Sequence, residues 1–193
     1  VRVPGSTAEK AAELVRYTNI EKKYAVKYWC IGNEPTLYQT TDIGKDYDTA
    51  KYNQVWREFA VAMRTIDPTI QFLGPEVHQF TSNLAANPKD TSGLDWMDEF
   101  LKANGDMVDI VSIHRYPFPR DRYVTTTIDE MRANPPEWDE IIPLLRSRIQ
   151  ELTGRDLRGA ATTLDAIGRL YERQGRYEEA LREFQQGRDL WQQ

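Results

Sequence analysis

The residues best suited to chemistry lie in segment 27–35, where a short apolar run ends in Asn33, Glu34 and Pro35. In parallel α/β folds, ligands gather at the carboxyl ends of the strands, so a carboxylate there could act on a substrate. Because successive strand residues face opposite sides, Asn33 and Glu34 can share one ligand only if the chain is leaving the strand, as Pro35 indicates. Partial burial beside Trp29 would raise the pKa of Glu34 toward the range of a general acid. The alternative is that Glu34 only caps a loop.

Three further polar residues follow two other apolar runs. His114 and Tyr116 are two positions apart, so their side chains would lie on the same side of an extended chain. We expect them to line a substrate site, and the alternative for His114 is a hydrogen-bonded structural role. Glu76 follows Gly74-Pro75 and would face the same rim as a substrate-binding carboxylate, unless it is a solvated loop residue.

Short apolar runs rich in β-branched and aromatic residues predict the strands that would position these side chains, at 24–31, 70–74 and 108–113. Amphipathic stretches of helical length alternate with them, at 7–19, 52–66, 94–103 and 138–152. This alternation indicates parallel βα units. The predicted fold class is therefore α/β, with three parallel strands and flanking helices.

Composition excludes several classes of protein. The chain has 193 residues, 40% hydrophobic and 28% charged, which suffices for one domain and a small appendage. No stretch approaches the ~20 apolar residues of a membrane span, and the net charge of −5 comes without a Lys/Arg stripe, so we expect neither a membrane nor a nucleic-acid partner. One cysteine, Cys30, excludes a disulfide framework, and without a phosphate loop or a metal-spaced His/Cys cluster we expect no cofactor and no metal. The compartment is not indicated.

The last residues follow a different pattern. Apolar and small side chains there take the spacing of two packed antiparallel helices: Leu164, Ile167, Gly168, Tyr171, Ala180, Leu181 and Phe184. This spacing resembles a single tetratricopeptide repeat, and the alternative is an ordinary amphipathic helical hairpin. We therefore predict two domains, 1–157 and a C-terminal helical hairpin at 158–193, which could bind a protein partner.

Asn33-Glu34-Pro35, the stretch 52–75 and the run 109–117 together resemble the clan of retaining glycoside hydrolases built on the (β/α)₈ barrel, within it the arabinofuranosidase-like and xylosidase-like families. The resemblance covers about residues 1–155 and implies that the predicted strands are the fourth, fifth and sixth of a barrel. It implies that Glu34 is the acid/base and that Asn33 binds the sugar 2-hydroxyl. It also implies that His114 and Tyr116 line the site of a carbohydrate substrate.

A complete barrel needs ~250 residues, so this chain would hold only the middle of one. Retaining enzymes also need a second carboxylate, the nucleophile, ~5 to 5.5 Å from the acid. In the resembled clan it is a Glu ending the seventh strand, whereas segment 156–164 contains no Glu. We expect strands one to three, seven and eight to be missing, and the chain to be a glycoside hydrolase fragment that is inactive alone. The first residue, Val1, points to an internal piece or a processed product.

Two other interpretations stay open. The tail could recruit a protein, with the barrel fragment as scaffold, or the chain could be a truncated product without a function of its own. The unpaired edges of a three-stranded sheet also predict self-association.

Overall fold

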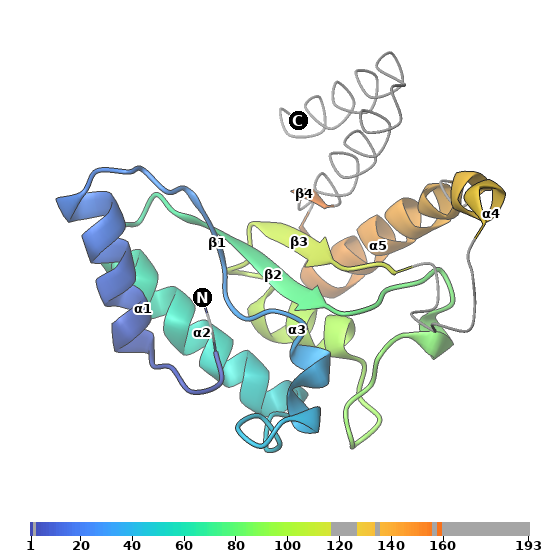
Figure 1. Cartoon of the computed structure of the whole chain (residues 1–193), viewed down its shortest axis with the longest axis horizontal. Coiled ribbons are helices and arrows are strands. Elements are labelled where there is room, and N and C mark those ends of the chain that lie inside the picture. Colours follow the sequence, from blue (N-terminus) through green and yellow to red (C-terminus); the bar gives the residue numbers. More distant parts are fainter. Residues whose placement is uncertain (2, 117–126, 134–135, 156–157, 160–193) are drawn as a thin grey trace, which may run out of the picture.

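The computed structural model describes residues 1, 3–116, 127–133, 136–155 and 158–159. Its centre is a parallel sheet in the order β1-β2-β3-β4, formed by β1 (Tyr28–Cys30), β2 (Gln71–Val77), β3 (Ile110–Ile113) and β4 (Arg158–Gly159) (Figure 1). The α/β class and the three predicted parallel strands are confirmed. Because neighbouring strands run the same way, their carboxyl ends meet at one edge of the sheet.

β1 is shorter than the predicted strand 24–31 for a local reason. Lys23 and Ala25 have positive φ angles of 55° and 54°, a left-handed conformation that interrupts an extended chain. The side chain of Asn19 then pairs with Val26, accepting from its N–H at 2.9 Å and donating to its carbonyl at 2.9 Å. These bonds satisfy the Val26 backbone in place of a neighbouring strand.

β4 is a two-residue strand that the sequence analysis did not predict. It follows the last helix and pairs with β3 through Ile110↔Arg158 and Val111↔Gly159. Arg158 and Gly159 therefore belong to the sheet, although neither residue type favours a strand, because the free edge of β3 supplies their hydrogen bonds. The predicted hairpin otherwise falls on 160–193, which lie outside the described residues, so the hairpin and the division into two domains stay predictions.

The opposite edge of the sheet, along β1, is partly covered by the first residue. The Val1 amino group donates to the Cys30 carbonyl at 2.5 Å, and the Gly32 N–H donates to the Val1 carbonyl at 2.8 Å. This is the hydrogen-bond pattern of a parallel strand beside Ile31.

The four predicted helices form at the expected places, and the short helix at 128–133 is one that the sequence analysis did not predict. The helices are α1 (Ala8–Val15), continued by the π-helix η1 (Arg16–Glu21), then α2 (Thr49–Ile66), α3 (Trp96–Asn104), α4 (Ile128–Ala133) and α5 (Glu137–Thr153). Two 3₁₀ helices, η2 (Pro35–Thr40) and η3 (Leu84–Ala86), lie in the connections. α2 begins earlier than predicted because Asp48 accepts from the Lys51 N–H at 2.7 Å, and Asp95 caps α3 in the same way.

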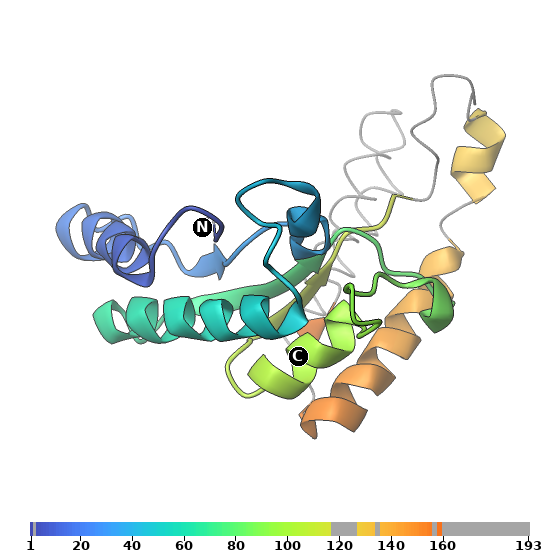
Figure 2. The same cartoon turned by 90° about the horizontal axis from the view of Figure 1, so that it is seen from below.

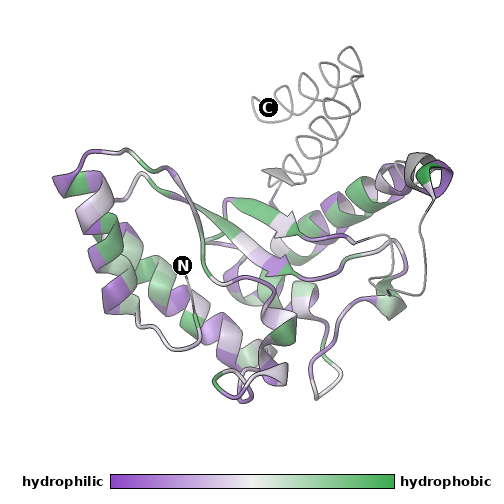
Figure 3. Cartoon of the chain, in the orientation of Figure 1, coloured by the Kyte–Doolittle hydropathy of each residue, from purple (hydrophilic) through white to green (hydrophobic). Residues whose placement is uncertain are grey.

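The core lies between the sheet and the helices α2, α3 and α5, which run along one of its faces, while α1 packs on α2 (Figure 2). The helices carry hydrophobic residues on one side and hydrophilic residues on the other (Figure 3). Buried aromatic rings fill the middle in edge-on contacts, with Trp56 at 5.1 Å from Phe100 and 5.7 Å from Phe72 between ring centroids. Among the described residues, no helix combines the length and the apolar character that crossing a membrane requires.

Tyr52 in α2 connects this core to the strand ends. Its side chain is fully buried, and its hydroxyl lies 2.9 Å from the Ile31 carbonyl and 3.3 Å from the Pro75 carbonyl. One helix residue thus holds the chain just after β1 and the end of β2 in place.

Replacing Tyr52 by Phe should lower the free energy of unfolding by about 1–3 kcal/mol, because buried carbonyls lose their donor while the ring stays. Urea unfolding followed by circular dichroism measures this change. The control Tyr24→Phe, at a residue 65% exposed, should change stability by less than about 0.5 kcal/mol. Equal stability of the two variants would show that the Tyr52 hydroxyl does not hold the strand ends.

Candidate active site

The predicted site residues lie where three neighbouring parallel strands end. Glu34 follows β1, Glu76 is the next-to-last residue of β2, and His114 comes directly after β3. Glu34 and His114 are 80 residues apart along the chain, and the order of the strands in the sheet brings them together.

Hydrogen bonds join them into one cluster. The two ring nitrogens of His114 contact different carboxylates, Nδ1 at 2.9 Å from Glu34 Oε1 and Nε2 at 2.8 Å from Glu76 Oε2. The Tyr116 hydroxyl donates to Glu34 Oε1 at 2.9 Å, and the Cys30 thiol donates to Glu76 Oε1 at 3.0 Å. We call Cys30, Glu34, Glu76, His114 and Tyr116 the His114 cluster; Cys30 is the member that the sequence did not single out.

The backbone is strained at both carboxylates. Glu34 and Glu76 have φ angles of 48° and 60°, in the left-handed region that costs a non-glycine residue about 1–3 kcal/mol. The Glu34 N–H donates to the Glu76 carbonyl at 2.9 Å and fixes one turn against the other. The chain does leave the strand before Glu34, with Pro35 opening η2, as predicted.

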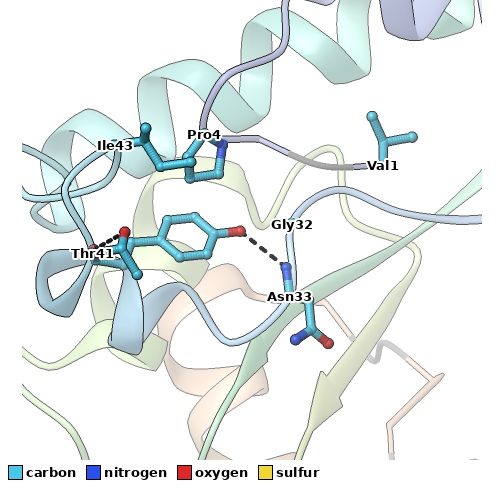
Figure 4. A pocket seen from close by; sticks show the side chains of 7 residues that line it. Val1, Pro4, Gly32, Asn33, Thr41 and Ile43 are labelled. Carbon is cyan, nitrogen blue, oxygen red and sulfur yellow. Dashed lines mark hydrogen bonds between the residues drawn. The ribbon is translucent and has the colours of Figure 1, made fainter.

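Asn33 is not part of the cluster's hydrogen bonds. Its side chain is exposed, and its backbone N–H donates to the Tyr38 hydroxyl at 3.0 Å. This bond borders a pocket of about 390 Å³ lined by Val1, Pro4, Gly32, Asn33, Tyr38, Thr41 and Ile43 (Figure 4). The pocket therefore adjoins the cluster through Asn33, which precedes Glu34, and through Val1, whose amino group donates to the Cys30 carbonyl.

The pKa of Glu34 is lowered, contrary to the expectation from the sequence. Burial raises it, but hydrogen bonds from His114 and Tyr116, together with the positive charge of His114, outweigh that effect. Trp29 contributes no bond to Glu34, since its indole N–H donates to the Val26 carbonyl at 2.9 Å. Glu34 is therefore ionised at neutral pH in this state.

His114 is the cation that balances the two carboxylates. Its hydrogen bond to Glu76 is the main cause that raises its pKa to about 9, against the opposing effect of burial and with help from Glu34. Burial would raise the pKa of Glu76, but the bonds from His114 and Cys30 lower it. Burial and the charge of Glu76 raise the pKa of Cys30 to about 12, so Cys30 stays a neutral donor.

A second set of contacts, missed in the sequence, fixes the segment after β3. Arg115 donates to Glu137 Oε1 of α5 at 2.7 and 2.9 Å and to Gln79 Oε1 at 3.2 Å. Gln79 also bonds both backbone groups of Tyr116, accepting at 3.2 Å and donating at 3.1 Å. The only sequence signal was that Arg115 must face away from His114 and Tyr116.

The cluster can move a proton at Glu34 Oε1, where a carboxylate meets an imidazolium and a phenol. Within the part of the chain that the structure describes, no group of three or more His, Cys, Asp or Glu side chains is arranged to hold a metal ion.

The family follows from residues 6–118, which match the family model described as glycoside hydrolase family 44. The chain belongs to glycoside hydrolase family 44. The matched span contains the whole His114 cluster. The match assigns the chain to one family of barrel glycosidases. The sequence analysis had indicated the same kind of protein but two other families, the arabinofuranosidase-like and the xylosidase-like.

Curated relatives of this family 44 chain include two arabinofuranosidases. The intracellular exo-alpha-(1->5)-L-arabinofuranosidase 1 of Bacillus subtilis (strain 168) is 29% identical over 111 residues, covering 57% of this chain and 20% of the relative. The exo-alpha-(1->6)-L-arabinofuranosidase of Bifidobacterium longum is 28% identical over 117 residues, covering 61% and 20%. The chain thus spans about a fifth of the length of these relatives.

Solved structures share the fold. A family 44 xyloglucanase from Paenibacillus polymyxa, in a structure with xyloglucan, has a TM-score of 0.56 at 17% identity, covering 82% of this chain and 43% of that one. A family 44 endoglucanase from Clostridium acetobutylium ATCC 824 gives 0.54 at 19%, covering 73% and 37%. A family 39 beta-xylosidase from Caulobacter crescentus gives 0.53 at 17%, covering 92% and 35%. The family 44 chain therefore has the fold of part of a glycosidase barrel.

The charge of His114 predicts a pH dependence of stability. Its pKa is about 9 in the folded chain against 6.5 for the free side chain, so its contribution is complete below pH 6.5 and is lost as the pH rises through 9. The contribution amounts to at most about 3 kcal/mol. Urea unfolding at several pH values should show the stability difference between the wild type and His114→Gln shrinking across this window. A difference that stays constant would show that His114 is not charged by the fold.

Proposed function

We propose that the parent protein hydrolyses glycosidic bonds with retention of configuration and that Glu34 is its acid/base. The observation that carries the proposal is the position of the Glu34 carboxylate, at the end of β1 and in hydrogen-bond contact with His114 and Tyr116 at the end of β3. Membership of family 44 supports it, because the cluster lies within the matched span. Since the chain covers a fifth of its curated relatives, the activity is that of the whole protein.

In this proposal Glu34 protonates the leaving oxygen and later takes a proton from the attacking water. Its hydrogen bonds keep it ionised at neutral pH, so it must gain a proton as the substrate binds. A bound sugar would exclude water from the 21% of the Glu34 side chain that is exposed, and desolvation raises the pKa of a carboxyl group. Asn33 would hold the 2-hydroxyl, while His114 and Tyr116 line the sugar subsite.

Glu76 does not fit the nucleophile. Both of its carboxylate oxygens are hydrogen-bonded, its side chain is 12% exposed, and the imidazole of His114 lies between it and Glu34. A sugar carbon cannot reach both carboxylates across that ring. The nucleophile of the proposed reaction is therefore a residue outside the described part of the chain.

The names of similar proteins support a proposal for the substrate class: the two relatives are α-L-arabinofuranosidases, and proteins of similar fold include a xyloglucanase and a β-xylosidase. We propose a saccharide of arabinose, xylose or glucose units as the substrate of the parent protein. Linkage and chain length depend on subsites that other parts of the barrel would complete.

In the full-length protein that contains these residues, Glu34→Gln should slow hydrolysis of substrates with poor leaving groups by about 10²–10⁴-fold. Activated aryl glycosides should be affected much less, because their departure needs little protonation. Steady-state rates on both substrate types measure the contrast. The matched control is Glu58→Gln, an exposed carboxylate on α2 that bonds Gln54 and should leave both rates unchanged. Equal losses on both substrates would remove Glu34 from the acid/base role.

Residues 1–193 by themselves should hydrolyse even activated glycosides at least about a thousandfold more slowly than the full-length protein, because one of the two carboxylates is not in place. Rates and product stereochemistry by NMR provide the measurement. Efficient hydrolysis with retention, abolished by Glu34→Gln, would instead place a nucleophile among residues 1–193.

A further inference from the structure

We propose that Glu76 is a positioning residue that fixes the orientation and the positive charge of His114 and thereby holds a charged hydrogen-bond donor against the Glu34 carboxylate of the neighbouring strand end. This inference deepens the proposed function, on which its catalytic consequence rests. It replaces substrate contact as the main role of Glu76 with an action through His114.

Both carboxylate oxygens of Glu76 are hydrogen-bonded. Its Oε1 accepts from the Cys30 thiol at 3.0 Å, which leaves Oε2 directed at His114 Nε2, 2.8 Å away. The His114 backbone N–H donates to the Val77 carbonyl at 2.8 Å, so the residue after Glu76 also anchors the histidine. The bond to Nε2 and the backbone bond together fix the His114 ring, and in this orientation its Nδ1 lies 2.9 Å from Glu34 Oε1.

The charges around His114 favour the cation because of Glu76. The titratable groups that contact the ring are Glu34 after β1, Glu76 on β2 and Tyr116 after β3, while Cys30 and the buried Ser112 lie behind Glu76. Glu76 is the more buried of the two carboxylates, with 12% of its side chain exposed against 21% for Glu34. Its charge is therefore the less screened by water, and its removal would leave Glu34 alone to oppose burial, which favours neutral His114.

The consequence for Glu34 has a definite sign. An adjacent positive charge lowers the pKa of Glu34, and His78 acts in the same direction as His114. If Glu76 lost its charge, His114 would become neutral at a lower pH but would still be charged in the range in which Glu34 titrates. Because loss of the Glu76 charge also removes a repulsion on the Glu34 anion, the pKa of Glu34 would fall. The apparent values belong to the coupled cluster, so both should move in the same direction, to lower pH.

The direct test is NMR titration of histidine ring signals in the 193-residue chain, which contains two histidines, so that His78→Gln assigns the signal of His114. Wild-type His114 should titrate near pH 9, and Glu76→Gln should lower its pKa by at least about one unit. Glu76→Asp keeps the charge and should retain part of the effect, while Glu58→Gln should have none. An unchanged His114 titration in Glu76→Gln would overturn the proposal. If that variant does not fold, a wild-type His114 that titrates at or below pH 6.5 would overturn it as well.

The catalytic consequence is tested in the full-length protein through the pH dependence of kcat/KM, which reports groups of the free enzyme. Glu76→Gln should move the alkaline limb, set by loss of the Glu34 proton, to lower pH because the repulsion between the two carboxylates is lost, and Glu76→Asp should move it less. A purely structural role would lower the rate without moving the limb, and that result would overturn the proposal. Failure of the leaving-group contrast for Glu34→Gln would overturn the proposed function alone, because the His114 titration does not depend on it.

Discussion

One imidazole ring between two carboxylates organises this end of the sheet. His114 touches Glu34 with one nitrogen and Glu76 with the other, which joins the carboxyl ends of three strands. Two partly buried anions this close would repel each other and favour protonation of one of them. A cation between them allows both to stay ionised, and the positions of Tyr116 and Cys30 follow, since each donates a hydrogen bond to one of the carboxylates.

The scaffold restricts the strand ends enough to hold this arrangement. Glu34 and Glu76 occupy left-handed backbone conformations, which persist only where the surroundings enforce them. Two sets of hydrogen bonds enforce them. The Tyr52 hydroxyl in the core bonds the Ile31 and Pro75 carbonyls, and the Glu34 N–H bonds the Glu76 carbonyl. On the far side, the Arg115 guanidinium connects the end of β3 to Glu137 of α5. The site is thus built on packed elements and not on free loops.

In the proposed reaction, the described part of this family 44 chain supplies one half of a retaining site. The proton-handling half would be Glu34 and its hydrogen-bond partners, which lie at the ends of three neighbouring strands within residues 30–116. The covalent half needs a carboxylate from another position around the barrel. β4, paired with β3, marks where the sheet continues in that direction.

The sequence by itself determined the α/β class, the parallel strands, most helix positions and four members of the cluster, because periodicity and strand-ending motifs depend on local residue order. It placed Asn33 with Glu34, whereas the fold leaves Asn33 outside the hydrogen bonds of the cluster. It also gave the wrong direction for the pKa of Glu34, since burial was visible in the sequence and the facing cation was not. Only the tertiary structure decided that His114 bridges two carboxylates, that Cys30 supports one of them and that Arg158 and Gly159 extend the sheet. Those contacts join residues 38 to 80 positions apart, whose proximity depends on strand order and packing.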